Sequence, residues 1–205
     1  MSDPRNTAAK TDEAPDNDWA KVRRLDREVS DEAWIRALLH RAAVGTLATV
    51  HDGQPFLNTN TFVYDEQAHA IYLHTARTGR TRTNVDAEER VCFGVSEMGR
   101  LLPAKTALNF SVEYAGVVVF GRAAVVADEE EARRALQRLL DKYAPHLRPG
   151  RDYQPITAEE LARTSVYRVR IERWSGKQKV APADFPGAFR YGEPPPGLAQ
   201  EESIS

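Results

Sequence analysis

The sequence predicts a mainly β protein with peripheral helices, built on six antiparallel strands that form a small closed or split β-barrel. Several segments alternate apolar and polar residues and are joined by short turns, which is typical of half-buried strands. One segment, 128–143, instead places its apolar residues at helical spacing. The 205 residues are enough for one domain with a full core.

The first half of the expected domain is a helix followed by three strands. A helix is expected over 30–43, with Ser30 as its N-cap and with Asp31 and Glu32 suited to the positive end of the helix dipole. Gly45 ends this helix. The three strands are expected at 44–50, 55–64 and 70–75, with turns at 51–54 and 65–67.

The second half contains two helices and the remaining strands. An amphipathic helix over 128–143 is indicated by its apolar spacing, by a capping pair of Asp128 with Glu131, and by Pro145, which stops it. The other elements are a short helix at 80–87 and strands at 90–96, 107–115, 117–127 and 165–174.

The two ends of the chain contain little that a core could bury. Residues 1–20 are rich in Asp, Asn, Pro and Thr, and residues 191–205 carry a proline cluster and acidic residues. We therefore expect a disordered N-terminal tail over 1–20, one domain over 21–190 and a flexible C-terminal tail over 191–205.

Composition excludes several classes of partner. A formal net charge of -2 gives no sign of nucleic-acid binding, and no run of about 18 apolar residues indicates a membrane span. The N-terminus lacks a signal-peptide pattern, and the single Cys92 rules out an intramolecular disulfide, so we expect a cytoplasmic protein. No histidine pair has metal-ligand spacing, so no metal site is expected.

The turn at 75–82 has the composition of a phosphate site. It places three arginines and three threonines around Gly79 at the expected start of a helix. Free N–H groups and the helix dipole favour an anion there, and arginine adds charge-assisted hydrogen bonds. The alternative is a solvated surface turn with three unrelated arginines.

The order of these segments resembles the pyridoxamine 5′-phosphate oxidase-like family of FMN-binding split barrels. Within that family the chain is most similar to the nitroimidazole-resistance (nitroimidazole reductase-like) branch. The matching segments span approximately 43–177 and comprise Val44-Gly45-Thr46-Leu47-Ala48-Thr49, Asp52-Gly53-Gln54-Pro55-Phe56, Ile71-Tyr72-Leu73-His74-Thr75-Ala76, Gly79-Arg80, Val91-Cys92-Phe93, Val112-Glu113-Tyr114, Val117 to Ala123, Tyr167-Arg168-Val169 and Ser175-Gly176-Lys177.

The resemblance implies a homodimer that binds FMN at the subunit interface. The phosphate would lie in the turn, and the family's usual lysine is replaced here by Thr81, which Arg80 and Arg82 flank. Trp174 and Lys177 would reach the cofactor from the neighbouring subunit. The implied cofactor-binding residues are Asn58, Thr59, Asn60, Thr61, His74, Thr75, Ala76, Thr78, Gly79, Arg80, Thr81, Arg82, Trp174 and Lys177.

His74 is the catalytic candidate, because the branch shares this histidine beside the flavin and a neutral imidazole can donate or accept a proton. The alternative is a hydrogen-bonded histidine without a chemical role. The expected function is an NAD(P)H-dependent oxidoreductase that reduces a small organic acceptor, with nitroaromatic compounds as one candidate class. Two other readings stay open: a non-catalytic flavin-binding or stress protein, and a split barrel that binds a deazaflavin or haem.

Overall fold

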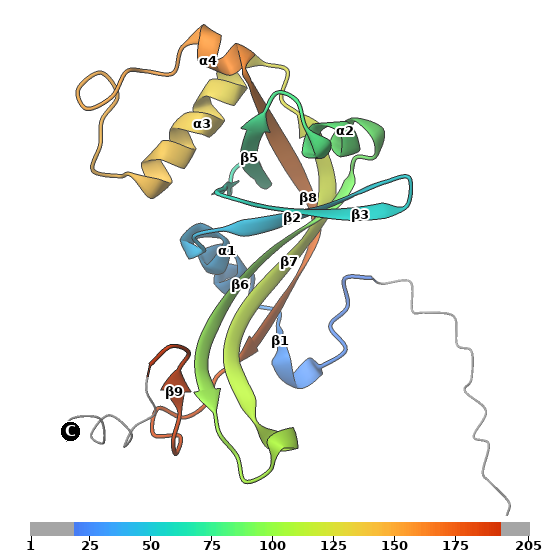
Figure 1. Cartoon of the computed structure of the whole chain (residues 1–205), viewed down its shortest axis with the longest axis vertical. Helices are drawn as coiled ribbons and strands as arrows, with labels where there is room; N and C mark the ends of the chain where they lie inside the picture. Colours follow the sequence, from blue (N-terminus) through green and yellow to red (C-terminus); the bar gives the residue numbers. More distant parts are fainter. Residues whose placement is uncertain (1–18, 194–205) are drawn as a thin grey trace, which may run out of the picture.

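Nine strands of the computed structural model join into one antiparallel sheet that curls into a split barrel (Figure 1). The structure describes residues 19–193. The strands are β1 (Glu28–Val29), β2 (Gly45–His51), β3 (Gln54–Asn60), β4 (Val63–Asp65), β5 (Ala70–Ala76), β6 (Arg90–Leu102), β7 (Ser111–Val125), β8 (Thr164–Lys179) and β9 (Phe189–Arg190). The helices are α1 (Glu32–Arg41), α2 (Arg80–Ala87), α3 (Glu129–Tyr143) and α4 (Ala158–Ala162), with single 3₁₀ turns at Leu25–Arg27 and Ala107–Asn109. No described helix is both long and apolar enough to span a membrane.

The chain itself closes the barrel. The strand order is β3-β2-β6-β7-β8-β5-β4, so β3 and β4 lie at the two ends of the hydrogen-bonded path. Only residues 61 and 62 separate these two strands in the sequence. The six long strands agree with the overall prediction of six antiparallel strands, although the individual ranges gave seven because two were placed where β7 runs, and the short β1, β4 and β9 add to them.

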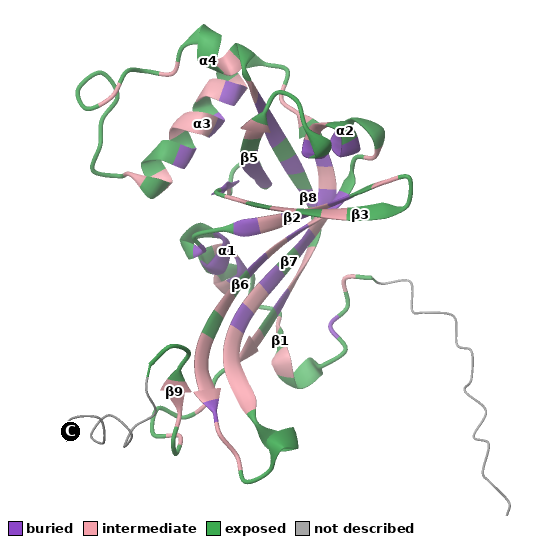
Figure 2. Ribbon diagram, in the orientation of Figure 1, coloured by how far each residue is buried: buried purple, intermediate pink, exposed green. Residues whose placement is uncertain are grey.

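The core lies on the inner face of the sheet, under α1 and α2. Ile35 and Leu38 of α1 and Val85 of α2 pack with Phe93, Val119 and other buried side chains of the sheet. A smaller cluster joins α3 to the other face of β5. Figure 2 shows buried residues alternating with intermediate or exposed ones along β6, β7 and β8, which is the period of two that the sequence displays.

Most predicted elements are confirmed. The helix over 80–87 has the expected bounds, and the carboxylate of Asp128 accepts a hydrogen bond from the Glu131 N–H (2.6 Å), which caps α3. Hydrogen bonds hold the C-terminal end of α3 to the barrel. The Tyr143 hydroxyl donates to the Ala43 carbonyl (2.8 Å), and the Lys142 ammonium donates to the Phe62 carbonyl (3.1 Å), although burial lowers its pKa to about 8.

Three local predictions are wrong. Asp31, not Ser30, caps α1, because its carboxylate accepts from the Ala33 N–H. The strand expected over 55–64 is two strands, β3 and β4, because the chain passes from one end of the sheet to the other between them.

The strand pair expected over 107–115 and 117–127 is also wrong, because β7 is one continuous strand. Gly116 lies inside the ladder opposite Ser96, and the hairpin turn that connects β7 to β6 falls instead at residues 103–110. Residues 1–18 of the expected N-terminal tail and residues 194–205 of the expected C-terminal tail lie outside the described residues, whereas Trp19 is described and packs on Phe120.

Candidate functional site

Helix α2 begins with an open N-terminus. Its N-cap, Gly79, has φ 141°, and no side chain caps the helix. A Cβ atom at Gly79 would meet nothing within 4 Å, so the space in front of the helix is free. The first N–H groups of a helix lack intrahelical partners and carry the positive end of its dipole, so this arrangement can hold an anion.

The three arginines of the turn have different surroundings. The Arg77 guanidinium donates to the Ala162 carbonyl (2.6 Å), which fixes it to α4. Arg82 donates to Asp86 (2.6 Å) and to the Ser165 hydroxyl (3.3 Å), so it bridges α2 and β8. Protein groups therefore already bind two of the three guanidinium groups.

Arg80 is the arginine that stays available to a ligand. Its guanidinium lies over the Phe56 ring, 5.4 Å from the centroid, and pairs with no carboxylate within residues 19–193. Phe56 belongs to β3, so the contact holds the charge between the helix start and the edge strand of the sheet. A positive charge without an anionic partner at a helix N-terminus suits a phosphate group.

Two asparagines of β3 extend this site along the strand. The Asn58 side chain donates to the hydroxyl of the buried Thr81 (2.8 Å), so Thr81 joins α2 to β3. The buried amide nitrogen of Asn60 has no hydrogen-bond partner among the described groups. Because a buried donor without a partner is costly, a ligand carbonyl or a second subunit would stabilise this position.

A hollow of about 510 Å³ lies next to Arg80, between α2 and the β2–β3 turn. Phe56 of β3 lines it, and Arg80, Thr83 and Asn84 of α2 line it from the helix. His51 closes the side at the turn. The sequence reasoning did not select Phe56, Thr83 or His51, although the alternation along β3 places Phe56 on the same face as Asn58.

Other expected site residues lie on the outer face of the sheet. The hydroxyls of Thr59 and Thr46 are hydrogen bonded (2.8 Å), and Thr46 lines a hollow of about 350 Å³ together with Lys177. Thr61 is exposed in the link between β3 and β4. The structure of one chain therefore places Lys177 on the opposite face of the sheet from Asn58.

The end of β5 presents His74 and Thr75 to opposite faces. Thr75 points inward and its hydroxyl contacts the Tyr167 hydroxyl (3.0 Å). His74 pairs with Val166, which packs in the cluster under α3. The residue is accessible to solvent, but the protein around its imidazole lowers its pKa below the ordinary value, so it is neutral at pH 7.

Ala76 and Thr78 are exposed around the turn. Trp174 is half-buried and packs against the core, with its ring 4.7 Å from that of His69 and the Arg36 guanidinium 5.6 Å from its centroid. Side chains alternate along β8 between Trp174 and Lys177, so the two residues expected to reach the cofactor together face opposite sides.

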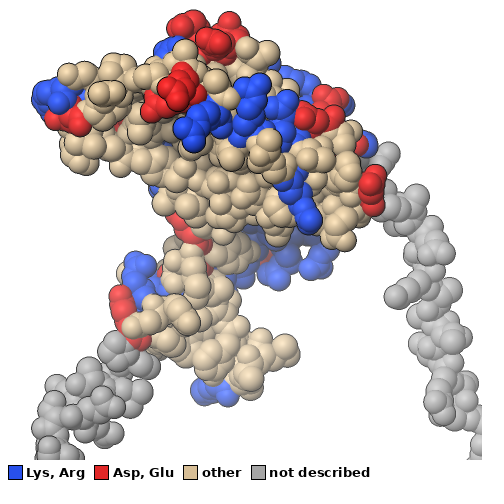
Figure 3. Space-filling model, turned by 45° about the horizontal axis from the view of Figure 1, so that its top comes forward, with Lys and Arg blue, Asp and Glu red and all other residues tan. Residues whose placement is uncertain are grey.

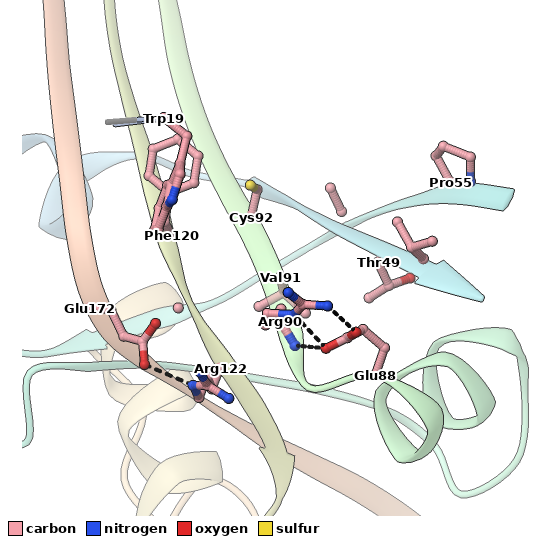
Figure 4. Close-up of a pocket in the computed structure, with 13 residues that line it drawn as sticks. Trp19, Thr49, Pro55, Glu88, Arg90, Val91, Cys92, Phe120, Arg122 and Glu172 are labelled. Carbon is pink, nitrogen blue, oxygen red and sulfur yellow. Dashed lines mark hydrogen bonds and ion pairs between the residues drawn. The ribbon is translucent and has the colours of Figure 1, made fainter. Parts of the chain in front are cut away.

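A further hollow of about 540 Å³ lies on the outer face of the sheet (Figure 4). Trp19 packs on Phe120 with ring centroids 4.7 Å apart, and Cys92 lies in the same hollow. Ion pairs of Arg90 with Glu88 and of Arg122 with Glu172 border it. Burial raises the pKa of the Cys92 thiol, so this residue behaves as a small apolar side chain.

Charges of both signs are interspersed on the upper part of the molecule in the view of Figure 3. Among the described residues, no three His, Cys, Asp or Glu side chains form a group that could hold a metal ion. Within residues 19–193, the hollows that a ligand could enter are the one at the α2–β3 site, the two outer hollows and a smaller one of about 200 Å³ between β5 and α3.

Comparison with solved structures shows which proteins share this fold. A flavocytochrome from Azotobacter vinelandii is 24% identical, with a TM-score of 0.71 and 87% of each chain covered. An FAD and haem binding protein from Mycobacterium smegmatis is 22% identical, with a TM-score of 0.67 and coverage of 76% of this chain and 74% of that one. A candidate 5-nitroimidazole antibiotic resistance protein from Bacteroides thetaiotaomicron is 18% identical, with a TM-score of 0.62 and coverage of 74% and 86%.

These likenesses show a common fold. No curated protein sequence matches the chain. A family model described as pyridoxamine 5′-phosphate oxidase matches residues 31–178, which is most of the chain and includes every element from α1 to nearly the end of β8. The chain therefore belongs to the pyridoxamine 5′-phosphate oxidase family.

Proposed function

We propose that this protein binds FMN and works as an NAD(P)H-dependent oxidoreductase that reduces a small organic acceptor. The observation that carries the proposal is the open start of α2 beside Arg80, whose guanidinium has no anionic partner within residues 19–193. The phosphate of FMN would accept hydrogen bonds from the first N–H groups of α2 and from Arg80.

The residues present fit the cofactor. Gly79 leaves room for a phosphate, and the unpartnered amide nitrogen of Asn60 can donate to a carbonyl oxygen of the ring. Bound flavin supplies the electron transfer itself, so the protein needs to bind, orient and hydrogen-bond the ring. The membership of the family and the flavin-binding proteins among its structural relatives support this assignment.

The proposal is tested on the purified protein. We expect a yellow protein with flavin absorbance, from which heat releases a compound with the mass of FMN or of a dinucleotide that contains it. NAD(P)H should bleach the flavin bands, and an added nitroaromatic acceptor should restore them. A colourless protein that binds no added FMN would contradict the proposal, whereas flavin binding without NAD(P)H oxidation would favour the non-catalytic alternative.

His74 is proposed to act in turnover through its neutral imidazole. The surrounding protein partly desolvates the imidazole and lowers its pKa, so the neutral form persists through neutral pH and is lost only in acid, as the pH falls through that lowered pKa. We expect NAD(P)H turnover to be flat around pH 7 and to fall at acid pH. In His74→Gln the acid limb should disappear while the melting temperature stays unchanged. An identical pH profile in both proteins would show that the histidine has no chemical role.

We also propose a homodimer that meets through the outer face of the sheet. The described helices α1 and α2 pack on the inner face, whereas the outer face exposes Leu57, Met98 and Val118 to solvent. Around them lie small residues such as Gly94 and Gly116, which allow close approach of a second chain. Exposed apolar surface of this kind marks an interaction site.

Val118→Arg tests the dimer, because a charge on this face would have to be desolvated on association. We expect wild type to sediment as a dimer at micromolar concentration and Val118→Arg as a monomer. Leu140→Arg on α3 is a matched control, because the two residues are similarly exposed, 40% for Val118 and 37% for Leu140. A monomeric wild type would contradict the dimer.

A second candidate is a haem-binding protein, alone or with flavin. It is favoured by the A. vinelandii flavocytochrome and the M. smegmatis FAD and haem binding protein, and by the accessible, neutral imidazole of His74. The absorbance spectrum separates the candidates, because bound haem gives an intense band near the blue edge of the visible range that flavin lacks. Loss of that band in His74→Ala would identify the ligand.

A further inference from the structure

We propose that the hollow between α2 and the β2–β3 turn is a subsite for an adenosine phosphate unit, joined to the phosphate site through Arg80. The inference rests on the proposed function, because it assumes that a flavin phosphate lies at the start of α2. It goes further in assigning a dinucleotide where the sequence implies only a mononucleotide.

The position of the hollow is the first argument. It has a volume of about 510 Å³, and Arg80 belongs both to its lining and to the open helix start. Small-molecule sites generally have volumes of roughly 300–1,000 Å³. A ligand with its phosphate on the N-terminus of α2 can therefore continue past Arg80 into the hollow, where a second phosphate would still meet the same guanidinium.

The chemistry of the lining is the second argument. Phe56 gives an aromatic surface beside a cation, on which a base can stack. The ring nitrogen Nδ1 of His51 is buried and has no hydrogen-bond partner among the described groups, so it can satisfy a ligand amine or hydroxyl. Asp52 also lines the hollow. One of its carboxylate oxygens lies 3.3 Å from Nε2 of His51, and the other can accept hydrogen bonds from ribose hydroxyls. One aromatic surface, one cation and neighbouring polar atoms are what an adenosine phosphate requires.

Adenosine phosphate could come from two molecules. In FAD it is attached directly to the flavin phosphate, and in NAD(P)H it is carried by the reductant. Both place the same chemical group in the hollow, so the test compares each dinucleotide with its mononucleotide counterpart.

Thr83→Trp is the test variant, because Thr83 is exposed and lines the hollow one turn beyond the phosphate site. The bulky side chain should fill the hollow beside Arg80. It also removes the hydrogen bond from the Thr83 hydroxyl to the Gly79 carbonyl (3.3 Å), so the preference of the variant for FMN over riboflavin checks that its phosphate site is intact. Ala87→Trp is the matched control on the same helix, because Ala87 is exposed but does not line the hollow. Circular dichroism melting of both variants checks that they fold.

Titrations with riboflavin, FMN and FAD, followed by flavin fluorescence, give the first readout. We expect wild type and Ala87→Trp to bind FAD about tenfold more tightly than FMN, which is the affinity that one base stack contributes. Thr83→Trp should bind FMN and FAD equally. For the reductant, Thr83→Trp should raise the KM for NADPH and leave that for reduced nicotinamide mononucleotide unchanged if NADPH is the source of the group.

The outcomes separate the two proposals. An effect of Thr83→Trp on either dinucleotide supports the subsite and identifies its source. If FAD and FMN bind wild type equally and the KM for NADPH is unchanged in Thr83→Trp, the subsite is overturned, while FMN binding tighter than riboflavin would leave the proposed function intact. Equal binding of riboflavin, FMN and FAD, or no binding at all, overturns both.

Discussion

Gly121→Ala is expected to destabilise the protein more than any other alanine substitution of a glycine in the described sheet. Gly121 lies in β7 at the register shift where Gly121 pairs with Ile171 and Phe120 pairs with Arg173 of β8. A Cβ atom there would lie 2.1 Å from the Arg170 carbonyl oxygen. Because the obstacle is backbone in the middle of the sheet, the two strands must separate to accommodate a methyl group.

The expected cost is about 3 kcal/mol or more, at the upper end of overpacking in a filled core. For a domain of this size, each kcal/mol lowers the melting temperature by roughly 2–4 °C, so a decrease of about 10 °C is expected. Ala124→Val is the control, because Ala124 lies in the same strand β7 and is exposed, so the added methyl groups have room. Equal melting temperatures of the two variants would show that the bulge is not constrained as described.

This bulge illustrates what the sequence could not reveal. The alternation of β8 places Ile171 in the core, and strict alternation would put Trp174 on the other face. The extra residue at the register shift brings both into the core. Such a shift depends on the pairing of two strands about 50 residues apart, and no local pattern encodes it. Elements with local signals, such as the Asp128 cap of α3 and the short helix after Gly79, were predictable from the sequence.

Helix α4 was missed although its signal was present. The Thr157 hydroxyl accepts from the Glu160 N–H and the Glu160 carboxylate accepts from the Thr157 N–H, which is a capping box readable from the sequence. The same limits apply to the candidate site. Composition alone indicates a phosphate turn, but which arginine is free depends on α4 and β8, about 80 residues away, where Ala162 and Ser165 bind Arg77 and Arg82.

Arg80→Gln is expected to weaken FMN binding about ten- to a hundredfold. A charge-assisted hydrogen bond is worth roughly 1.5–3 kcal/mol, and about 1.4 kcal/mol corresponds to a tenfold change in affinity. The sequence gives Arg80 and Arg82 the same role. In the structure, however, Arg82 is held by Asp86 and Ser165, so Arg82→Gln provides a control that removes an equal charge from the same helix.

Comparing FMN with riboflavin isolates the contribution of the phosphate to binding. Riboflavin lacks the phosphate, so wild type, Arg80→Gln and Arg82→Gln should all bind it with similar affinity. FMN should bind Arg80→Gln more weakly than it binds wild type. The loss of FMN affinity in Arg80→Gln should also become smaller as the salt concentration is raised, because screening weakens the interaction between Arg80 and the phosphate at this exposed site. If FMN binds Arg80→Gln as tightly as wild type, the turn is an ordinary basic loop. If only Arg82→Gln is impaired, the phosphate lies on the β8 side of α2, and Arg82 exchanges Asp86 for the ligand.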